Sequence, residues 1–137
     1  MNKNIFYKPI KVKLKTYSAS KKSYGKLSLV DLKKDLPFKI SRIFFSYKVH
    51  KNFSRGGHAH KKNYQCIISV SGSLLIHTIN IKKKVKNFVL NKPNIALIIP
   101  KNTWTELKNY SRDCVCLVLA SGNYNETEYI RNKKLYL

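Results

Sequence analysis

The sequence predicts an all-β fold, because apolar segments of strand length recur along the chain and helical periodicity is nearly absent. The predicted strands follow one another at spacings of about ten residues, which is typical of a sandwich or a barrel. No internal repeat, and no linker rich in Pro, Gly or Ser, divides the 137 residues. We therefore expect residues 1–137 to form a single domain, long enough to bury a core without disulfides.

The first predicted strand is Ile10–Leu14, which alternates apolar and basic residues as a half-buried edge strand does. Further strands are predicted at Leu27–Val30, Ile40–Val49, Tyr64–Val70, Leu74–Ile79, Val85–Leu90, Ile95–Ile99 and Cys114–Ala120. Asp31–Pro37 is expected to be a loop, and Asn123–Leu137 a short helical or irregular C-terminal tail. A jelly-roll barrel accommodates such a series, because it leaves few strand edges exposed and encloses a pocket.

The formal net charge is +22, from 28 Lys and Arg residues against 6 Asp and Glu residues. Such a charge is typical of proteins that bind nucleic acid or membranes. However, the basic residues are mostly Lys and are spread along the whole chain, and Lys recognises bases and phosphates less specifically than Arg does. We therefore predict no nucleic-acid partner and no membrane partner, but a positive field that attracts an anionic substrate.

The sequence also favours a cytoplasmic location. It contains no apolar run of roughly 18 residues, the length needed to span a bilayer, and residues 1–5 are not followed by the apolar core of a signal peptide. Its three cysteines, an odd number without the spacing of a disulfide framework, suit a reducing compartment.

The residues best suited to chemistry are His58 and His60. On a strand, a spacing of two places both imidazoles on one face. A pair of histidines that faces into a barrel suits either metal binding or proton transfer, while a surface position beside Lys61 is the alternative. The preceding Arg55 and Gly57 favour a binding site, because glycine lets the backbone approach a ligand and arginine offers a fork for phosphate.

Two motifs resemble those of the cupin superfamily. His58-x-His60, Gln65 and Gly72 match the first cupin motif, in which metal-binding members have a Glu ligand at the Gln65 position. Pro100–Thr105 matches the second motif, but Thr105 replaces its histidine. Two of the four metal ligands are therefore missing, and the amide of Gln65 is a poor substitute for a carboxylate. We predict no bound metal and no cofactor, and histidines that act as general bases.

A narrower resemblance covers nearly the whole chain. The segments Arg42–Phe45, Arg55–Lys62, Ile98–Trp104, Leu117–Ser121 and Tyr124–Arg131 resemble, in this order, those of the dTDP-sugar 3,4-ketoisomerases. The resemblance implies a cupin-type jelly-roll barrel. It also implies a metal-free isomerase that converts dTDP-4-keto-6-deoxyglucose to a dTDP-3-keto-6-deoxyhexose through an enediol.

The resemblance also suggests roles for individual residues. His58 is the candidate to move the carbon-bound proton, and His60 to orient the substrate or relay the oxygen-bound proton. Tyr47 is the candidate for a tyrosine near the sugar, with core packing as the alternative. The candidates for substrate binding are Arg55, Arg42, Gly57, Lys61 and Trp104. A surface position remains open for Arg42, and core packing for Trp104.

Members of this family form dimers by exchanging β-strands, so the resemblance implies a homodimer. Ile10–Leu14 is the candidate for the exchanged strand, because an unpaired strand seeks a partner edge. Two other functions remain open at this point. One is a metal-dependent cupin enzyme, and the other is a non-catalytic basic cupin that holds a sugar nucleotide or nucleic acid.

Overall fold

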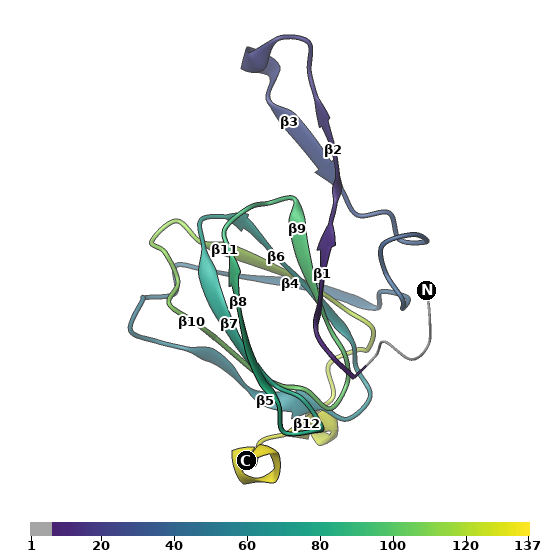
Figure 1. The fold of residues 1–137 in the computed structure, drawn as a ribbon, viewed down its shortest axis with the longest axis vertical. Coiled ribbons are helices and arrows are strands. Elements are labelled where there is room, and N and C mark those ends of the chain that lie inside the picture. Colours follow the sequence, from purple (N-terminus) through teal and green to yellow (C-terminus); the bar gives the residue numbers. More distant parts are fainter. Residues whose placement is uncertain (1–6) are drawn as a thin grey trace.

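The computed structural model describes residues 7–137, and most of its regular structure is β-strand (Figure 1). Residues 1–6 lie outside the described residues. The expectation that no signal peptide begins there therefore stays a prediction from the sequence. The first five strands are β1 (Ile10–Lys13), β2 (Lys15–Ser18), β3 (Lys26–Leu29), β4 (Arg42–Tyr47) and β5 (Arg55–His60). The next five are β6 (Gln65–Ser71), β7 (Leu74–Ile79), β8 (Val85–Leu90), β9 (Ile95–Ile99) and β10 (Trp104–Lys108). Then come β11 (Val115–Ala120) and β12 (Tyr129–Ile130), and the described part also contains the short 3₁₀ helices η2 (Lys22–Tyr24), η3 (Glu126–Glu128) and η4 (Lys133–Tyr136).

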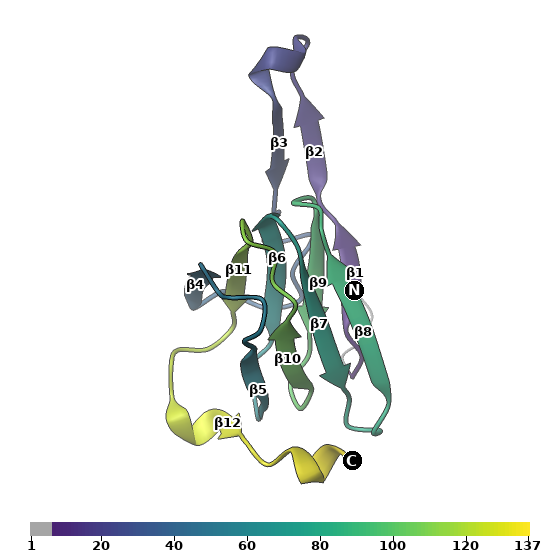
Figure 2. The same cartoon turned by 90° about the vertical axis from the view of Figure 1, so that its left-hand side faces the viewer.

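Two five-stranded sheets face each other and form a barrel (Figures 1 and 2). The strand order is β1–β9–β6–β11–β4 in the first sheet and β12–β5–β10–β7–β8 in the second. Neighbouring strands pair in antiparallel fashion in both sheets. The prediction of an all-β barrel with a short helical tail is therefore confirmed.

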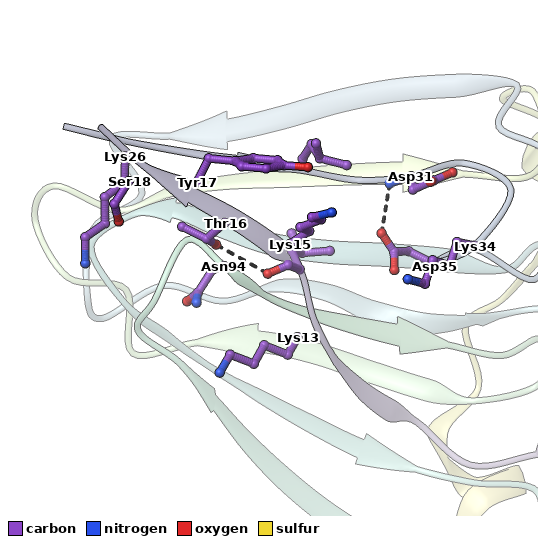
Figure 3. A pocket seen from close by; sticks show the side chains of 12 residues that line it. Lys13, Lys15, Thr16, Tyr17, Ser18, Lys26, Asp31, Lys34, Asp35 and Asn94 are labelled. Carbon is purple, nitrogen blue, oxygen red and sulfur yellow. Dashed lines mark hydrogen bonds between the residues drawn. The ribbon is translucent and has the colours of Figure 1, made fainter. Parts of the chain in front are cut away.

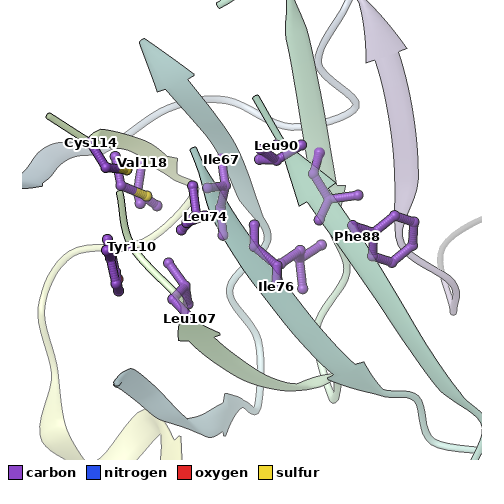
Figure 4. Packing of buried hydrophobic residues seen from close by; sticks show 12 residues of the cluster. Ile67, Leu74, Ile76, Phe88, Leu90, Leu107, Tyr110, Cys114 and Val118 are labelled. Carbon is purple, nitrogen blue, oxygen red and sulfur yellow. The ribbon is translucent and has the colours of Figure 1, made fainter. Parts of the chain in front are cut away.

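Apolar side chains from both sheets fill the interior of the barrel. Ile67 and Val118 of the first sheet pack with Leu74, Ile76 and Leu90 of the second, and all five are almost completely buried (Figure 4). Side chains alternate between the two faces of a strand, so every second residue of these strands points inward. Burial of this apolar surface is the main source of stability, at about 25 cal/mol for each Å² removed from water.

The outer face of the first sheet is covered only in part. The segment of residues 30–40 places Leu36 and Phe38 over Ile68 and Leu119. This cover does not protect the edge strand β4, where Ile43 is 60% exposed. Strand β4 is also shorter than the apolar strand predicted at Ile40–Val49, and many of its residues are exposed.

Strands β2 and β3 form a hairpin that projects beyond the barrel (Figures 1 and 2). Among the strands of residues 7–137, these two pair only with each other. Their apolar side chains Tyr17 and Leu27 are exposed. An isolated two-stranded hairpin is marginally stable in water, so this one lacks the packing that usually supports such an element.

Strand β5 contains a β-bulge at its glycine pair. Thr105 of β10 pairs with His58, whereas the next residue of β10 pairs with Gly56, which leaves Gly57 as the extra residue. The φ angles of Gly56 and Gly57 are 82° and 71°, in the left-handed region that favours glycine. A bulge re-aims the side chains that follow it, and here it precedes the two histidines.

The described part of the chain, residues 7–137, contains no helix that is both long and apolar enough to cross a membrane.

We predict that Gly56→Ala destabilises the protein more than Gly57→Ala does. Both substitutions place a Cβ on left-handed backbone, which costs about 1–2 kcal/mol. A Cβ at Gly56 would also lie 2.7 Å from the carbonyl oxygen of Thr105, whereas nothing lies within 4 Å of a Cβ at Gly57. Urea unfolding followed by circular dichroism measures both losses, and equal losses would refute this account of the bulge.

Candidate active site

A cavity of about 190 Å³ lies between the two sheets, beside β5. Phe44 of β4, Leu107 of β10 and Val118 of β11 give it apolar walls, while His58 and Gln65 bring polar groups into it. The cavity therefore has the nonpolar barrel interior on one side and β5, the strand that carries the predicted histidines, on the other. A few convergent polar groups in an apolar cavity are typical of small-molecule sites.

His58 lines this cavity, and its environment keeps the imidazole neutral. Burial and, to a smaller extent, the nearby His60 lower the pKa of His58 from 6.5 to about 4, while a hydrogen bond with the backbone at Gly56 opposes these effects. The ring centroids of His58 and His60 are 4.9 Å apart. At neutral pH His58 is thus an unprotonated base that faces the cavity.

His60 lies deeper than His58 and has a partner on each ring nitrogen. Its Nδ1 lies 2.8 Å from Oε2 of Glu128, and its Nε2 lies 3.1 Å from the amide nitrogen of Gln65. Burial lowers the pKa of His60, and the hydrogen bond with Glu128 opposes this shift. Only 6% of the residue is exposed.

The C-terminal tail runs past the end of β5 that carries the histidines (Figure 2). Strand β12 pairs with β5, with Tyr129 opposite His60. The ring of Tyr129 lines the cavity, and its centroid lies 4.7 Å from that of His58 and 4.7 Å from that of His60. The guanidinium of Arg131 lies over the ring of Tyr129, 4.9 Å from its centroid. The tail thus helps to bury both imidazoles.

Two arginines lie close to the histidines. Arg55 lines the cavity where β5 begins. Arg42 lies near His60, whose pKa it helps to lower, and its guanidinium contacts the rings of Phe44 and Tyr124 at 5.0 and 5.9 Å. The Nε and Nη2 atoms of Arg42 are buried and have no hydrogen-bond partner within the described residues. A buried charged donor without a partner is costly, so Arg42 is ready to receive an acceptor from a ligand.

Tyr47 was expected near the sugar, but the structure places it elsewhere. It is 59% exposed and does not line the cavity. It pairs with Val115, whereas Ser46, one residue earlier, lines the cavity. Because side chains alternate along a strand, Tyr47 points to the outer face of the barrel.

Arg42 and His60 do not line the cavity themselves, and three other predicted binding residues also lie outside its lining. Trp104 is on the outer face of β10, packed against Tyr136 of the tail, and its indole nitrogen donates to Glu106. Gly57 is the bulged residue, and its neighbour Gly56 is the glycine that lines the cavity. Lys61 follows β5, is exposed, and contacts the tail through its backbone N–H.

The structure also brings in residues to which the sequence gave no role. Tyr129, Gln65 and Tyr110 line the cavity, and Glu128 holds His60. The Tyr110 side chain is buried, and this burial is the main reason that the pKa of its hydroxyl is raised. For Gln65 a signal existed, since it occupies the carboxylate position of the cupin motif. For Tyr129 and Glu128 the only signal was that the segment Tyr124–Arg131 resembles the family. That resemblance did not indicate that either residue contacts the histidines.

The donor set at the histidines does not resemble a metal centre. Within residues 7–137, no three His, Cys, Asp or Glu side chains are grouped so that they could hold a metal ion. The Nε2 atom of His60 faces the amide of Gln65, where a metal-binding cupin has a carboxylate. A neutral amide is a weak ligand for zinc or iron, so these residues do not fit such an ion.

Comparison with known proteins places this chain in a family. Residues 10–137 match the family described as "FdtA: WxcM-like, C-terminal". The chain is 35% identical over 120 residues, 84% of each sequence, to the TDP-4-oxo-6-deoxy-alpha-D-glucose-3,4-oxoisomerase of Aneurinibacillus thermoaerophilus. Among solved structures it resembles a 3,4-ketoisomerase from Helicobacter canadensis, with a TM-score of 0.85, 38% identity and 94% of each chain covered.

It also resembles QdtA, a sugar 3,4-ketoisomerase from Thermoanaerobacterium thermosaccharolyticum solved in complex with TDP. The TM-score is 0.86 and the identity 38%, over 96% of this chain and 93% of that one. A histidine-to-asparagine mutant of QdtA was solved in complex with TDP-4-keto-6-deoxyglucose. The fold and the site define a cupin-type barrel, as predicted. The chain belongs to the FdtA-like family, which confirms the family resemblance seen in the sequence.

We predict that the neutral histidines make the protein less stable in mild acid. The pKa of His58 is about 4 when folded and 6.5 when unfolded. The unfolded chain therefore binds more protons between these values, and the free energy of unfolding falls as the pH drops from 6.5 toward 4. Urea unfolding across this range measures the slope, which should be shallower in a His58→Asn variant. An unchanged slope in the variant would contradict the neutral state of His58 and its lowered pKa.

Proposed function

We propose that this protein is a TDP-sugar 3,4-ketoisomerase that converts TDP-4-keto-6-deoxyglucose to a TDP-3-keto-6-deoxyhexose. The observation that carries the proposal is the pair of neutral imidazoles on β5, where half-buried His58 lines the cavity and buried His60 lies behind it. Neutral histidines can accept protons, which is what an isomerisation next to a carbonyl requires. The family relationship supplies the substrate class, since relatives with 35–38% identity are named as isomerases of this kind.

In the proposed reaction His58 removes the proton from C3 of the sugar. The electron pair of the C3–H bond forms a double bond to C4, and the C4 carbonyl oxygen becomes the negatively charged oxygen of an enediolate. His60 carries the proton of the C3 hydroxyl to the oxygen at C4. His58 returns its proton to C4, which leaves a hydroxyl at C4 and a ketone at C3. The sugar is neither oxidised nor reduced overall, so the reaction needs no redox cofactor.

Substrate binding in this proposal uses the arginines and the tail. Arg55, at the rim of the cavity, would bind the diphosphate, because guanidinium pairs well with phosphate oxygens. Arg42, with two buried N–H groups that lack a partner, would bind an oxygen that becomes negative in the enediolate. Tyr129 closes the site and keeps water from the imidazoles.

We expect His58→Asn to abolish isomerisation, with a loss of activity of at least about 100-fold. The measurement is proton NMR of TDP-4-keto-6-deoxyglucose in D2O with purified, EDTA-treated protein. The wild-type protein should form a 3-keto product with deuterium at C4, because neither histidine requires a metal ion in this proposal.

The NMR experiment, together with binding measurements, distinguishes the isomerase from a metal-dependent cupin enzyme and from a non-catalytic binding module. Activity that appears only after a divalent metal is restored would mean a metal-dependent cupin enzyme. Binding of TDP without exchange or conversion would mean a non-catalytic binding module. Steep loss of binding to random DNA with rising salt would be the sign of a nucleic-acid partner, which we do not expect.

The proposed enzyme is a homodimer in which the β2–β3 hairpin, rather than Ile10–Leu14, is the exchanged element. In this structure β1 pairs with β9 of its own chain, whereas the hairpin is unsupported. Between the hairpin and the barrel lies a groove of about 770 Å³, lined by Lys13, Tyr17 and Asn94 among others (Figure 3). The edge strand β4 has exposed apolar side chains and, within the described residues, no second neighbour. In a dimer, the unsupported β2–β3 hairpin of one copy can pack on the unpaired edge strand β4 of the other copy, and the reverse.

We predict a dimer of about twice 15.9 kDa by light scattering after gel filtration. Tyr17→Lys on the hairpin and Ile43→Lys on β4 should each shift the mass toward the monomer. Val85→Lys, at a residue as exposed as Ile43, is the matched control and should leave the dimer intact. A monomeric wild-type protein, or dimers of unchanged mass in both variants, would contradict this interface.

The cytoplasmic location stays a prediction from the sequence. Its support is that Cys66, Cys114 and Cys116 are buried free thiols, as is common in a reducing compartment.

A further inference from the structure

Glu128 is held in one position by the backbone of the loop after β5. The N–H groups of Lys62 and Asn63 both donate to its Oε1, at 2.5 and 2.8 Å. Its side chain is only 11% exposed. Because one carboxylate oxygen is bound by two fixed donors, the other oxygen, Oε2, is directed at Nδ1 of His60. The carboxylate is thus placed by contacts that do not depend on the histidine.

These contacts determine which nitrogen of His60 carries the proton. Burial tends to raise the pKa of Glu128, but hydrogen bonds from Lys62 N–H, His60 and Asn63 N–H outweigh it, so the pKa is lowered and the carboxylate is ionised. An ionised carboxylate only accepts hydrogen bonds, so Nδ1 of His60 must be the donor. Nε2 then has a free lone pair, which accepts from the amide of Gln65 at 3.1 Å.

We propose that Glu128 is the positioning residue for His60 in the isomerisation, and this inference rests on the proposed function. Glu128 keeps the proton of the neutral ring on Nδ1, so that Nε2 can take the proton of the C3 hydroxyl. Gln65 lines the cavity, and its amide donates a hydrogen bond to Nε2 in the free protein. When the substrate binds, its C3 hydroxyl replaces this amide as the partner of Nε2.

The proton transfer balances within the site. The hydroxyl O–H bond breaks as an N–H bond forms on Nε2, which makes His60 an imidazolium. The same proton then passes to the oxygen at C4, and His60 returns to its neutral form. A buried imidazolium without a counter-ion is costly, and the carboxylate of Glu128 offsets its charge while it exists. The charged groups that face His60 also include Arg42, which opposes the imidazolium, so the contribution of Glu128 is needed.

The test compares Glu128→Gln with a control two residues away. In Glu128→Gln the side-chain oxygen still accepts from Lys62 and Asn63, so the amide NH2 faces Nδ1 of His60. Nδ1 must then accept, the ring proton moves to Nε2, and Nε2 can no longer take a proton. Glu126, in the same tail, is 56% exposed and pairs with Arg131 away from His60. Glu126→Gln therefore removes a tail carboxylate without changing the His60 contacts.

Two rates are measured with TDP-4-keto-6-deoxyglucose in D2O. One is formation of the 3-keto product, and the other is deuterium uptake at C3 of unconverted substrate, which reports His58. For Glu128→Gln we expect a loss of about 100-fold in kcat for product with KM changed less than about 3-fold, while uptake at C3 falls much less. Glu128→Asp, which keeps the charge, should restore part of the product rate. Glu126→Gln should leave the ratio of the two rates unchanged, because the charge of Glu126 acts weakly on the pKa of His58 and is not among the charges that shift the pKa of His60.

Each outcome separates this inference from the proposed function. A wild-type rate of product formation in Glu128→Gln overturns the role of Glu128 and leaves the isomerase intact. Equal losses of product formation and C3 uptake, together with a lower melting temperature in both Glu128 variants, would show a structural role and overturn it as well. A wild-type protein that neither exchanges nor converts the substrate overturns the proposed function, and the inference with it.

Discussion

The site depends on the antiparallel pairing of one strand on both of its edges. β5 is joined to β10 through the bulge at Gly56 and Gly57, and to β12 of the C-terminal tail on the other side. The first pairing places His58 and His60 against the apolar interior of the barrel, and the second brings Glu128 and Tyr129 over them. If either pairing were lost, the imidazoles would be exposed to water and their pKa values would move back toward 6.5.

The electrostatics of the molecule are divided between surface and site. The chain has a net charge of +22, yet several of its six acidic residues are used in specific contacts rather than spread over the surface. Glu128 binds His60, Glu106 binds Lys133 and the Trp104 indole, and Glu126 binds Arg131. The contacts of Glu128 with His60 and of Glu106 with Lys133 hold the tail against the barrel, whereas Glu126 and Arg131 pair within the tail. The remaining positive field would attract an anionic sugar nucleotide, while the chemistry takes place between neutral imidazoles.

The sequence predicted those features that depend on local pattern. The strands Leu74–Ile79, Val85–Leu90 and Ile95–Ile99 match the structure, and the two-residue spacing of the histidines predicts their common face. Tyr47 illustrates the limit, because an uncertainty of one residue in a strand exchanges the inner face for the outer one. β10 was missed because Pro100–Thr105 was interpreted only as a motif. β2 and β12 carry no apolar alternation. The contact between His60 and Glu128 joins residues 68 positions apart, and no local pattern reports such a distance.

The central claim is that both histidines are neutral at working pH and that the proton of His60 is on Nδ1. Long-range proton–nitrogen NMR spectra of the imidazole rings in 15N-labelled protein, recorded at about pH 7, test this directly. The account predicts two neutral rings, with the Nδ1–H tautomer for His60 and no titration of His58 until the pH approaches 4. An imidazolium signal from either ring at that pH, or the Nε2–H tautomer for His60, would contradict it.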